Sequence, residues 1–74
     1  MTAKTQYQFI HFEKIEDGGQ KSSYSCHSNK TNDELGRVSW YPRWRQYVFW
    51  SGDDTLFSVG CLSDIAEFIK QVTP

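Results

Sequence analysis

The last apolar segment of the chain, from Cys61 to Val72, repeats its apolar residues with the period of an α-helix. At about 100° per residue, one stripe collects Leu62, Ile65, Ala66, Ile69 and Val72, with Phe68 on its edge. Ser58 stands where the N-cap of this helix is expected. A single amphipathic helix has to bury such a stripe, and the segments before it predict the sheet on which it packs.

The rest of the chain consists of short segments rich in β-branched and aromatic residues, separated by clusters of turn-forming residues. The expected strands are Gln6–Ile15, Ser22–Ser28, Gly36–Tyr41, Trp44–Trp50 and a short fifth at Thr55–Ser58. Their connections, including a hairpin turn at Gly18-Gly19, are too short for parallel crossovers. The sequence therefore predicts one small α+β domain over residues 1–74, an antiparallel meander of four or five strands with the C-terminal amphipathic helix packed on one face.

The run WYPRWRQYVFW predicts a hairpin that turns at Tyr41-Pro42-Arg43-Trp44, because proline favours the second position of a turn. In this register Tyr41 lies opposite Trp44 and Val38 lies opposite Tyr47, and opposed residues share a face. The face expected to meet the helix carries Val38, Trp40, Arg45, Tyr47 and Phe49, with Arg45 at its rim, able to stack on Trp40. The other face carries Arg37, Ser39, Tyr41, Trp44, Gln46, Val48 and Trp50.

The second face of this hairpin combines aromatic and arginine side chains, the types enriched at the hot spots of protein interfaces. A protein partner, or a second copy of the chain, needs no net positive charge to bind there. The sequence therefore predicts a small non-enzymatic binding module, and its candidate partner-binding residues are Arg37, Tyr41, Arg43, Trp44, Arg45 and Trp50.

Two alternatives for this face stay open. Aromatic side chains on a sheet also stack nucleic-acid bases, and interleaved arginines bind phosphate. Against nucleic acid stands a net charge of −1 with a pI near 6.0, since such domains are usually basic. The other alternative is that the N-terminal strand or the loop Asn29–Glu34 covers Trp44 and Trp50, which would leave no site.

The residues suited to catalysis or metal binding form no recognisable pattern. Cys61 lies near a helix start, where the dipole lowers a thiol pKa, but no base or orienting group is placed beside it by the sequence. Cys26, His27, Cys61 and His11 supply four ligand types, yet adjacent strand residues such as Cys26 and His27 point to opposite faces. We expect no enzyme activity, no metal, no cofactor and no small-molecule substrate, and we expect both cysteines to pack in the core.

The N-terminal segment has no apolar run after Lys4, and the sequence contains no stretch long enough for a membrane helix. With only two cysteines, far apart in the chain, a disulfide framework is not indicated. These features predict a cytoplasmic protein with reduced thiols and no membrane partner.

The segments LGRVSWYPRWRQYVFW and TLFSVGCLSDIAEFI resemble a pattern found in a group of short bacterial and phage-type proteins. The shared features are a Leu-Gly, a Trp-Tyr, a Trp-Arg-x-Tyr-x-Phe and a Cys-Leu-x-Asp-Ile-Ala helix start, over about residues 35–70. The resemblance implies a prophage or mobile-element origin and transfers no activity. A sheet followed by one helix is also similar in architecture to the DNA-binding arm domains of transposon integrases, a likeness that carries no site.

Overall fold

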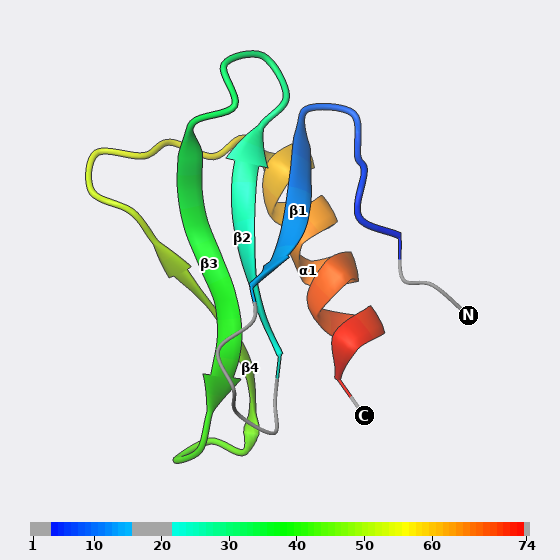
Figure 1. Ribbon diagram of the computed structural model, residues 1–74, viewed down its shortest axis with the longest axis vertical. Helices are drawn as coiled ribbons and strands as arrows, with labels where there is room; N and C mark the ends of the chain where they lie inside the picture. Colours follow the sequence, from blue (N-terminus) through cyan, green and yellow to red (C-terminus); the bar gives the residue numbers. More distant parts are fainter. Residues whose placement is uncertain (1–3, 16–21, 74) are drawn as a thin grey trace.

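A computed structural model describes residues 4–15 and 22–73 of the chain (Figure 1). Its regular elements are the strands β1 (Ile10–Ile15), β2 (Ser23–Ser28), β3 (Glu34–Tyr41) and β4 (Gln46–Ser51), followed by the helix α1 (Val59–Val72). The expected hairpin turn at Gly18-Gly19 lies outside the described residues.

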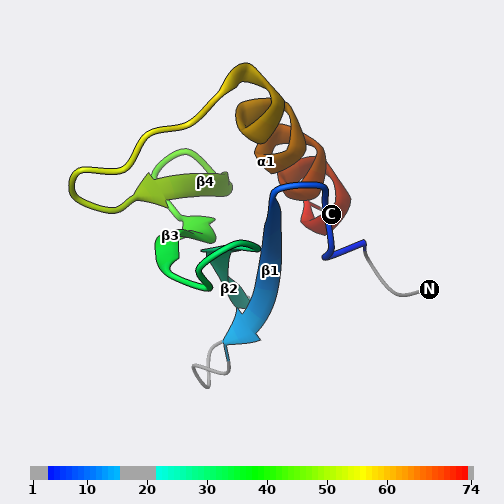
Figure 2. The ribbon, with the colours of Figure 1, turned by 90° about the horizontal axis from the view of Figure 1, so that it is seen from above.

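The four strands form one antiparallel sheet in the order β1-β2-β3-β4, so each strand pairs with its neighbour in the chain. The helix α1 lies against one face of this twisted sheet (Figure 2). The expected α+β fold, an antiparallel meander with a C-terminal helix on one face, is therefore confirmed. The described residues form four strands, and the segment Thr55–Ser58, where a short fifth strand was considered, has no regular structure.

Ser58 ends this irregular segment because it caps the helix. Its backbone is extended, with φ −77° and ψ 168°, and its Oγ accepts a hydrogen bond of 3.2 Å from the backbone N–H of Cys61. This is the N-cap role that the sequence predicts.

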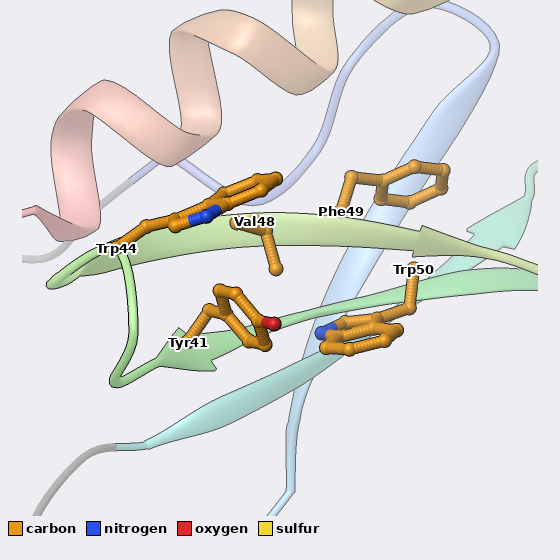
Figure 3. A pocket seen from close by; sticks show the side chains of 5 residues that line it. All are labelled: Tyr41, Trp44, Val48, Phe49 and Trp50. Carbon is orange, nitrogen blue, oxygen red and sulfur yellow. The ribbon is translucent and has the colours of Figure 1, made fainter.

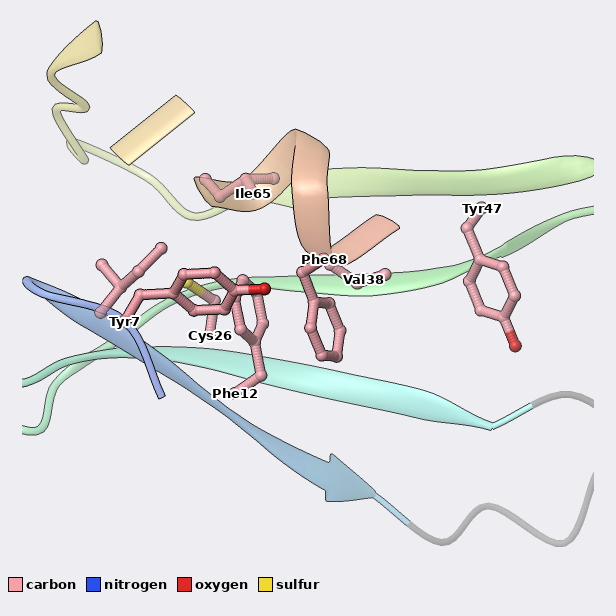
Figure 4. Packing of buried hydrophobic residues seen from close by; sticks show 8 residues of the cluster. Tyr7, Phe12, Cys26, Val38, Tyr47, Ile65 and Phe68 are labelled. Atoms are coloured by element: carbon pink, nitrogen blue, oxygen red, sulfur yellow. The ribbon is translucent and has the colours of Figure 1, made fainter. Parts of the chain in front are cut away.

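The core lies between α1 and the sheet, and Phe68 stands at its centre. Its ring stacks on that of Phe12 with a centroid separation of 4.0 Å and meets the Tyr24 ring edge-on at 5.0 Å. Figure 4 shows Phe68 pointing from the helix towards the sheet. Around it lie the other buried side chains of the cluster: Tyr7, Ile10, Cys26, Val38, Tyr47 and Ile65.

The helix is rotated about its axis relative to the expected stripe. Phe68 and Ile65 are fully buried, whereas Leu62 and Ala66 are exposed. The reason is the size of the Phe68 ring, for which β1 and β2 supply aromatic partners. Burying it turns Leu62 and Ala66, on the far side of the predicted stripe, towards solvent.

The first strand begins later than expected, at Ile10, because residues 5–7 fold back along its outer edge. The Phe12 N–H donates to the Thr5 carbonyl and the Tyr7 N–H donates to the Ile10 carbonyl, both at 2.9 Å. Tyr7 is buried and meets the Phe12 ring edge-on at 5.9 Å. The apolar residues that the sequence places on both faces of one long strand therefore belong to a shorter strand and a returning segment.

The hairpin of β3 and β4 has a different register from the predicted one. Tyr41 pairs with Gln46 and Val38 pairs with Phe49, so each pair is displaced by two residues. Because the displacement is even, the strand residues keep their predicted faces. Arg45 is the exception, since it lies in the turn with a positive φ of 52° and is exposed. Its expected pairing with Trp40 across the hairpin is wrong, because Trp40 pairs with Tyr47.

Gly36 on β3 allows β4 and the Phe49 ring to lie closer to its Cα than a larger residue would permit. A methyl group on Gly36 would lie 2.5 Å from the Trp50 carbonyl oxygen and 2.6 Å from Cζ of Phe49. The Phe49 ring therefore crosses over the glycine and meets the Phe57 ring edge-on at 5.3 Å. This contact joins the edge strand β4 to the segment that leads into α1.

We expect Gly36→Ala to destabilise the fold by about 1–3 kcal/mol, because neither a strand carbonyl nor a packed ring can move away cheaply. Urea unfolding measures the change. Gly60→Ala is the matched control, since its methyl group would lie 3.7 Å from Ser58 Oγ within the helix. The control is expected to be neutral or more stable by up to about 1 kcal/mol. Equal unfolding midpoints for the two variants would contradict the close approach at Gly36.

Candidate binding surface

Side chains alternate between the two faces of the sheet, and α1 covers only the face that carries Phe12 and Val38. We call the opposite side the open face, because no helix in the described part of the chain lies on it. Its half on β3 and β4 carries aromatic side chains, and its half on β1 and β2 carries histidines and serines.

The turn between β3 and β4 places Trp44 beside the open face. The Trp44 N–H donates to the Tyr41 carbonyl and the Arg45 N–H donates to the Pro42 carbonyl, each at 3.2 Å. These two overlapping turns are completed by the left-handed backbone of Arg45. The loop thus folds back over the end of the hairpin and brings the indole of Trp44 against Tyr41.

Tyr41 lies between two tryptophans. Its ring centroid is 4.9 Å from that of Trp44 and 5.8 Å from that of Trp50, and both contacts are edge-to-face. A pocket of about 260 Å³ is lined by these three residues with Val48 and Phe49 (Figure 3). We call Tyr41, Trp44, Val48 and Trp50 the aromatic surface.

Both tryptophans of the aromatic surface are exposed to solvent, Trp44 by 65% and Trp50 by 52%. The alternative in which the N-terminal strand or the loop Asn29–Glu34 buries them is therefore wrong. Edge-to-face contacts hold the rings in place without covering their outer sides, so the surface is both preformed and accessible.

The three arginines predicted for the site differ in their surroundings. Arg37 lies opposite Trp50 in the sheet, and its Nε is 3.2 Å from Oε2 of Glu34. Arg43 and Arg45 are exposed in the turn and make no ion pair with a described residue. The structure thus gathers Tyr41, Trp44 and Trp50 at one place and sets the arginines around them.

Val48 belongs to the aromatic surface but was not among the predicted site residues. The strand alternation had placed it on the correct face, between Gln46 and Trp50, and the presence of a pocket there was the missing information.

A second apolar surface was not expected from the sequence. Leu56 and Val59 are almost fully exposed and Leu62 is 51% exposed, all near the start of α1. This patch contains aliphatic side chains only.

A cluster of possible metal ligands lies at the other end of the open face. Glu13 Oε2 is 3.4 Å from Nε2 of His11 and 3.6 Å from Nε2 of His27. The three ligand atoms all lie within 4.8 Å of one another. Sequence reasoning grouped His11 and His27 with Cys26 and Cys61 and did not consider Glu13. The signal was present, however, because His11 and Glu13 are two residues apart on one strand and so share a face.

The two cysteines are free thiols on the helix side of the sheet: Cys26 is buried in the core, and Cys61 is partly buried and packs against it. Cys26 is fully buried, and burial, with a smaller contribution from the neighbouring Cys61, raises the pKa of its thiol to about 12. A thiol with such a pKa is not a nucleophile at neutral pH.

Comparisons of the chain with protein-family models, with curated proteins and with solved structures find no match. Within the residues described, no helix has both the length and the apolar character needed to cross a membrane.

We expect iodoacetamide at pH 8 to modify only Cys61 in the folded protein, and to modify Cys26 after unfolding in urea. Mass spectrometry of the two peptides measures both rates. Because the folded-state pKa of Cys26 exceeds its ordinary value of 9.0, the unfolded state releases this proton first, and stability falls as the pH rises above about 9. Modification of Cys26 as fast as Cys61 under native conditions would contradict the burial.

Proposed function

We propose that this chain is a small non-enzymatic binding module that engages a protein partner through the aromatic surface. The observation that carries the proposal is the Trp44–Tyr41–Trp50 cluster, in which two exposed indoles are fixed by one tyrosine around a pocket. Tryptophan, tyrosine and arginine are the residues that most often dominate the binding energy of protein interfaces. Because the rings are already ordered, binding costs little side-chain entropy.

The edge strand β4 favours an extended peptide as the bound element. The Gly52 N–H donates to the Leu35 carbonyl at 2.8 Å, which marks this pair as a hydrogen-bonded position. By the alternation of an antiparallel ladder, the backbone groups of Phe49 and Ser51 then point away from β3. Neither residue makes a backbone hydrogen bond on that side to another segment among the residues described. A peptide added there as a fifth strand would pass beside the aromatic surface.

Self-association is a version of the same proposal, in which β4 of a second copy takes the place of the peptide. Sedimentation equilibrium separates the two cases, because a dimer through β4 competes with the peptide. The cytoplasmic location and the prophage or mobile-element origin remain parts of this proposal and supply no further argument for it.

A nucleic-acid function is the second candidate, and the exposed Arg43 and Arg45 beside Trp44 favour it. Fluorescein-labelled oligo-dT and single-stranded RNA are suitable probes. Affinity that depends on phosphate contacts falls steeply as salt rises, whereas an aromatic protein interface changes little. If neither these probes nor their double-stranded counterparts change anisotropy at low salt, nucleic acid is excluded and the protein proposal stands alone.

Panning a displayed random-peptide library on the immobilised domain should enrich peptides that bind the aromatic surface. We expect Trp44→Ala and Trp50→Ala each to weaken a selected peptide at least tenfold, the scale of an interface hot spot. Calorimetry measures the affinity. Leu62→Ala, at a similarly exposed apolar position on α1, should leave it unchanged. Equal losses in all three variants, or none in either tryptophan variant, would refute the site.

Ser51→Pro tests strand addition, because proline removes the outward N–H of Ser51 without removing a hydrogen bond between β3 and β4. We expect a selected peptide to bind the Ser51→Pro variant at least tenfold more weakly, while Ser51→Ala binds normally. Circular dichroism checks that both variants are folded. Unchanged binding to the proline variant would show that the peptide does not extend the sheet and contacts the side chains alone.

A further inference from the structure

We propose that His11, Glu13 and His27 form a binding site for a divalent transition-metal ion of the zinc type on the open face. The site lies on β1 and β2, away from the aromatic surface on β3 and β4, and does not depend on the proposed function. Two imidazoles and one carboxylate are a ligand set that zinc accepts, with the remaining positions left to water or an external ligand.

The sheet register brings the three side chains together. His11 pairs directly with His27 across β1 and β2, and Glu13 lies two residues further along β1, so all three point to the same face. The two imidazole rings are nearly parallel, with centroids 5.4 Å apart and planes 12° apart. This placement is set by backbone pairing and therefore does not need a metal ion to form.

Two of the three ligand separations are close to the size of a zinc site, and the third, between the two histidine nitrogens, is at most 4.8 Å. Zinc–nitrogen and zinc–oxygen bonds of about 2.0–2.1 Å give a tetrahedron whose edges are about 3.3–3.4 Å. Glu13 Oε2 lies 3.4 Å and 3.6 Å from the two Nε2 atoms, close to these edges before any adjustment.

Hydrogen bonds at the other nitrogen of each ring fix the tautomers. The amide nitrogen of Asn29 donates to the carbonyls of Tyr7, at 2.8 Å, and Gln8, at 3.2 Å, so its Oδ1 faces His11. This amide oxygen can only accept a hydrogen bond, and it lies 2.6 Å from Nδ1 of His11. Nδ1 of His11 is therefore the nitrogen that carries the proton.

His27 is held in the same way. Its Nδ1 lies 3.1 Å from the carbonyl oxygen of Asn32, an acceptor, so this nitrogen is also the donor. In both neutral rings Nε2 then keeps its lone pair, on the side that faces Glu13. Metal-binding histidines are oriented by this kind of outer hydrogen bond.

Metal binding requires one local rearrangement. Lone pairs of parallel rings do not meet at one point, so the imidazoles rotate about χ2, a soft torsion for histidine. The Ser25 hydroxyl, 2.8 Å from Nε2 of His27, gives up this contact. Because both histidine side chains are mostly covered and Glu13 is half exposed, an ion reaches the cluster from the open face.

Titration of the intact chain with Co²⁺ and with Zn²⁺ tests the site. We expect Co²⁺ to give the intense visible absorption of a tetrahedral complex, and Zn²⁺ to displace it. When free Zn²⁺ exceeds its dissociation constant tenfold, the melting temperature should rise by about 5–10 °C. Binding should weaken as the pH is lowered, because imidazole has to be deprotonated to coordinate.

Variants separate this site from adventitious binding. His11→Asn and His27→Asn should each lose the absorption and the thermal shift. Glu13→Gln should weaken the affinity for Co²⁺ and for Zn²⁺ at least tenfold. Cys61→Ser, on the other face of the sheet, should retain them. Circular dichroism confirms that each variant is folded. No tetrahedral spectrum, a spectrum that survives both histidine substitutions, or one lost in Cys61→Ser would overturn the proposal.

Discussion

The stacking of Phe68 on Phe12 is the contact on which the arrangement of the domain depends. The two ring centroids are 4.0 Å apart, and the contact joins the middle of α1 to β1. β1 is the first strand of the sheet and α1 is the last element of the chain, so the contact brings together segments far apart in the sequence. One helix covers the sheet in the described part of the chain, and the face that does not receive Phe68 has no helix on it there. Every candidate site proposed here lies on that uncovered face or beside it.

The fold was predictable because its signals are local. The helix period, the Ser58 cap and the alternation along the strands each need only neighbouring residues. The rotation of α1 was not predictable, because it depends on the aromatic partners that Phe68 finds on β1 and β2. The late start of the first strand likewise depends on Tyr7 returning to the core, which is a tertiary effect.

The aromatic surface was predicted despite an incorrect register. Moving the pairing of β3 and β4 by two residues changed each opposed pair but left Tyr41 and Trp50 on the predicted face, since side chains alternate with a period of two. Arg45 was misplaced because a four-residue loop replaced the two-residue turn. The histidine cluster escaped prediction because it depends on the pairing of His11 with His27 across β1 and β2, and sequence reasoning assigned no residue register to these two strands.

The returning segment at residues 5–7 makes the two edges of the sheet, at β1 and at β4, unequal. Its hydrogen bonds occupy the outer edge of β1 at Ile10 and Phe12, and the charged Glu13 and Lys14 follow on the same strand. Charged residues and covered edges are the means by which natural sheets resist uncontrolled pairing. If copies of this domain join through β4, the less protected edge of each described sheet is used in the contact, so the assembly closes as a two-fold dimer.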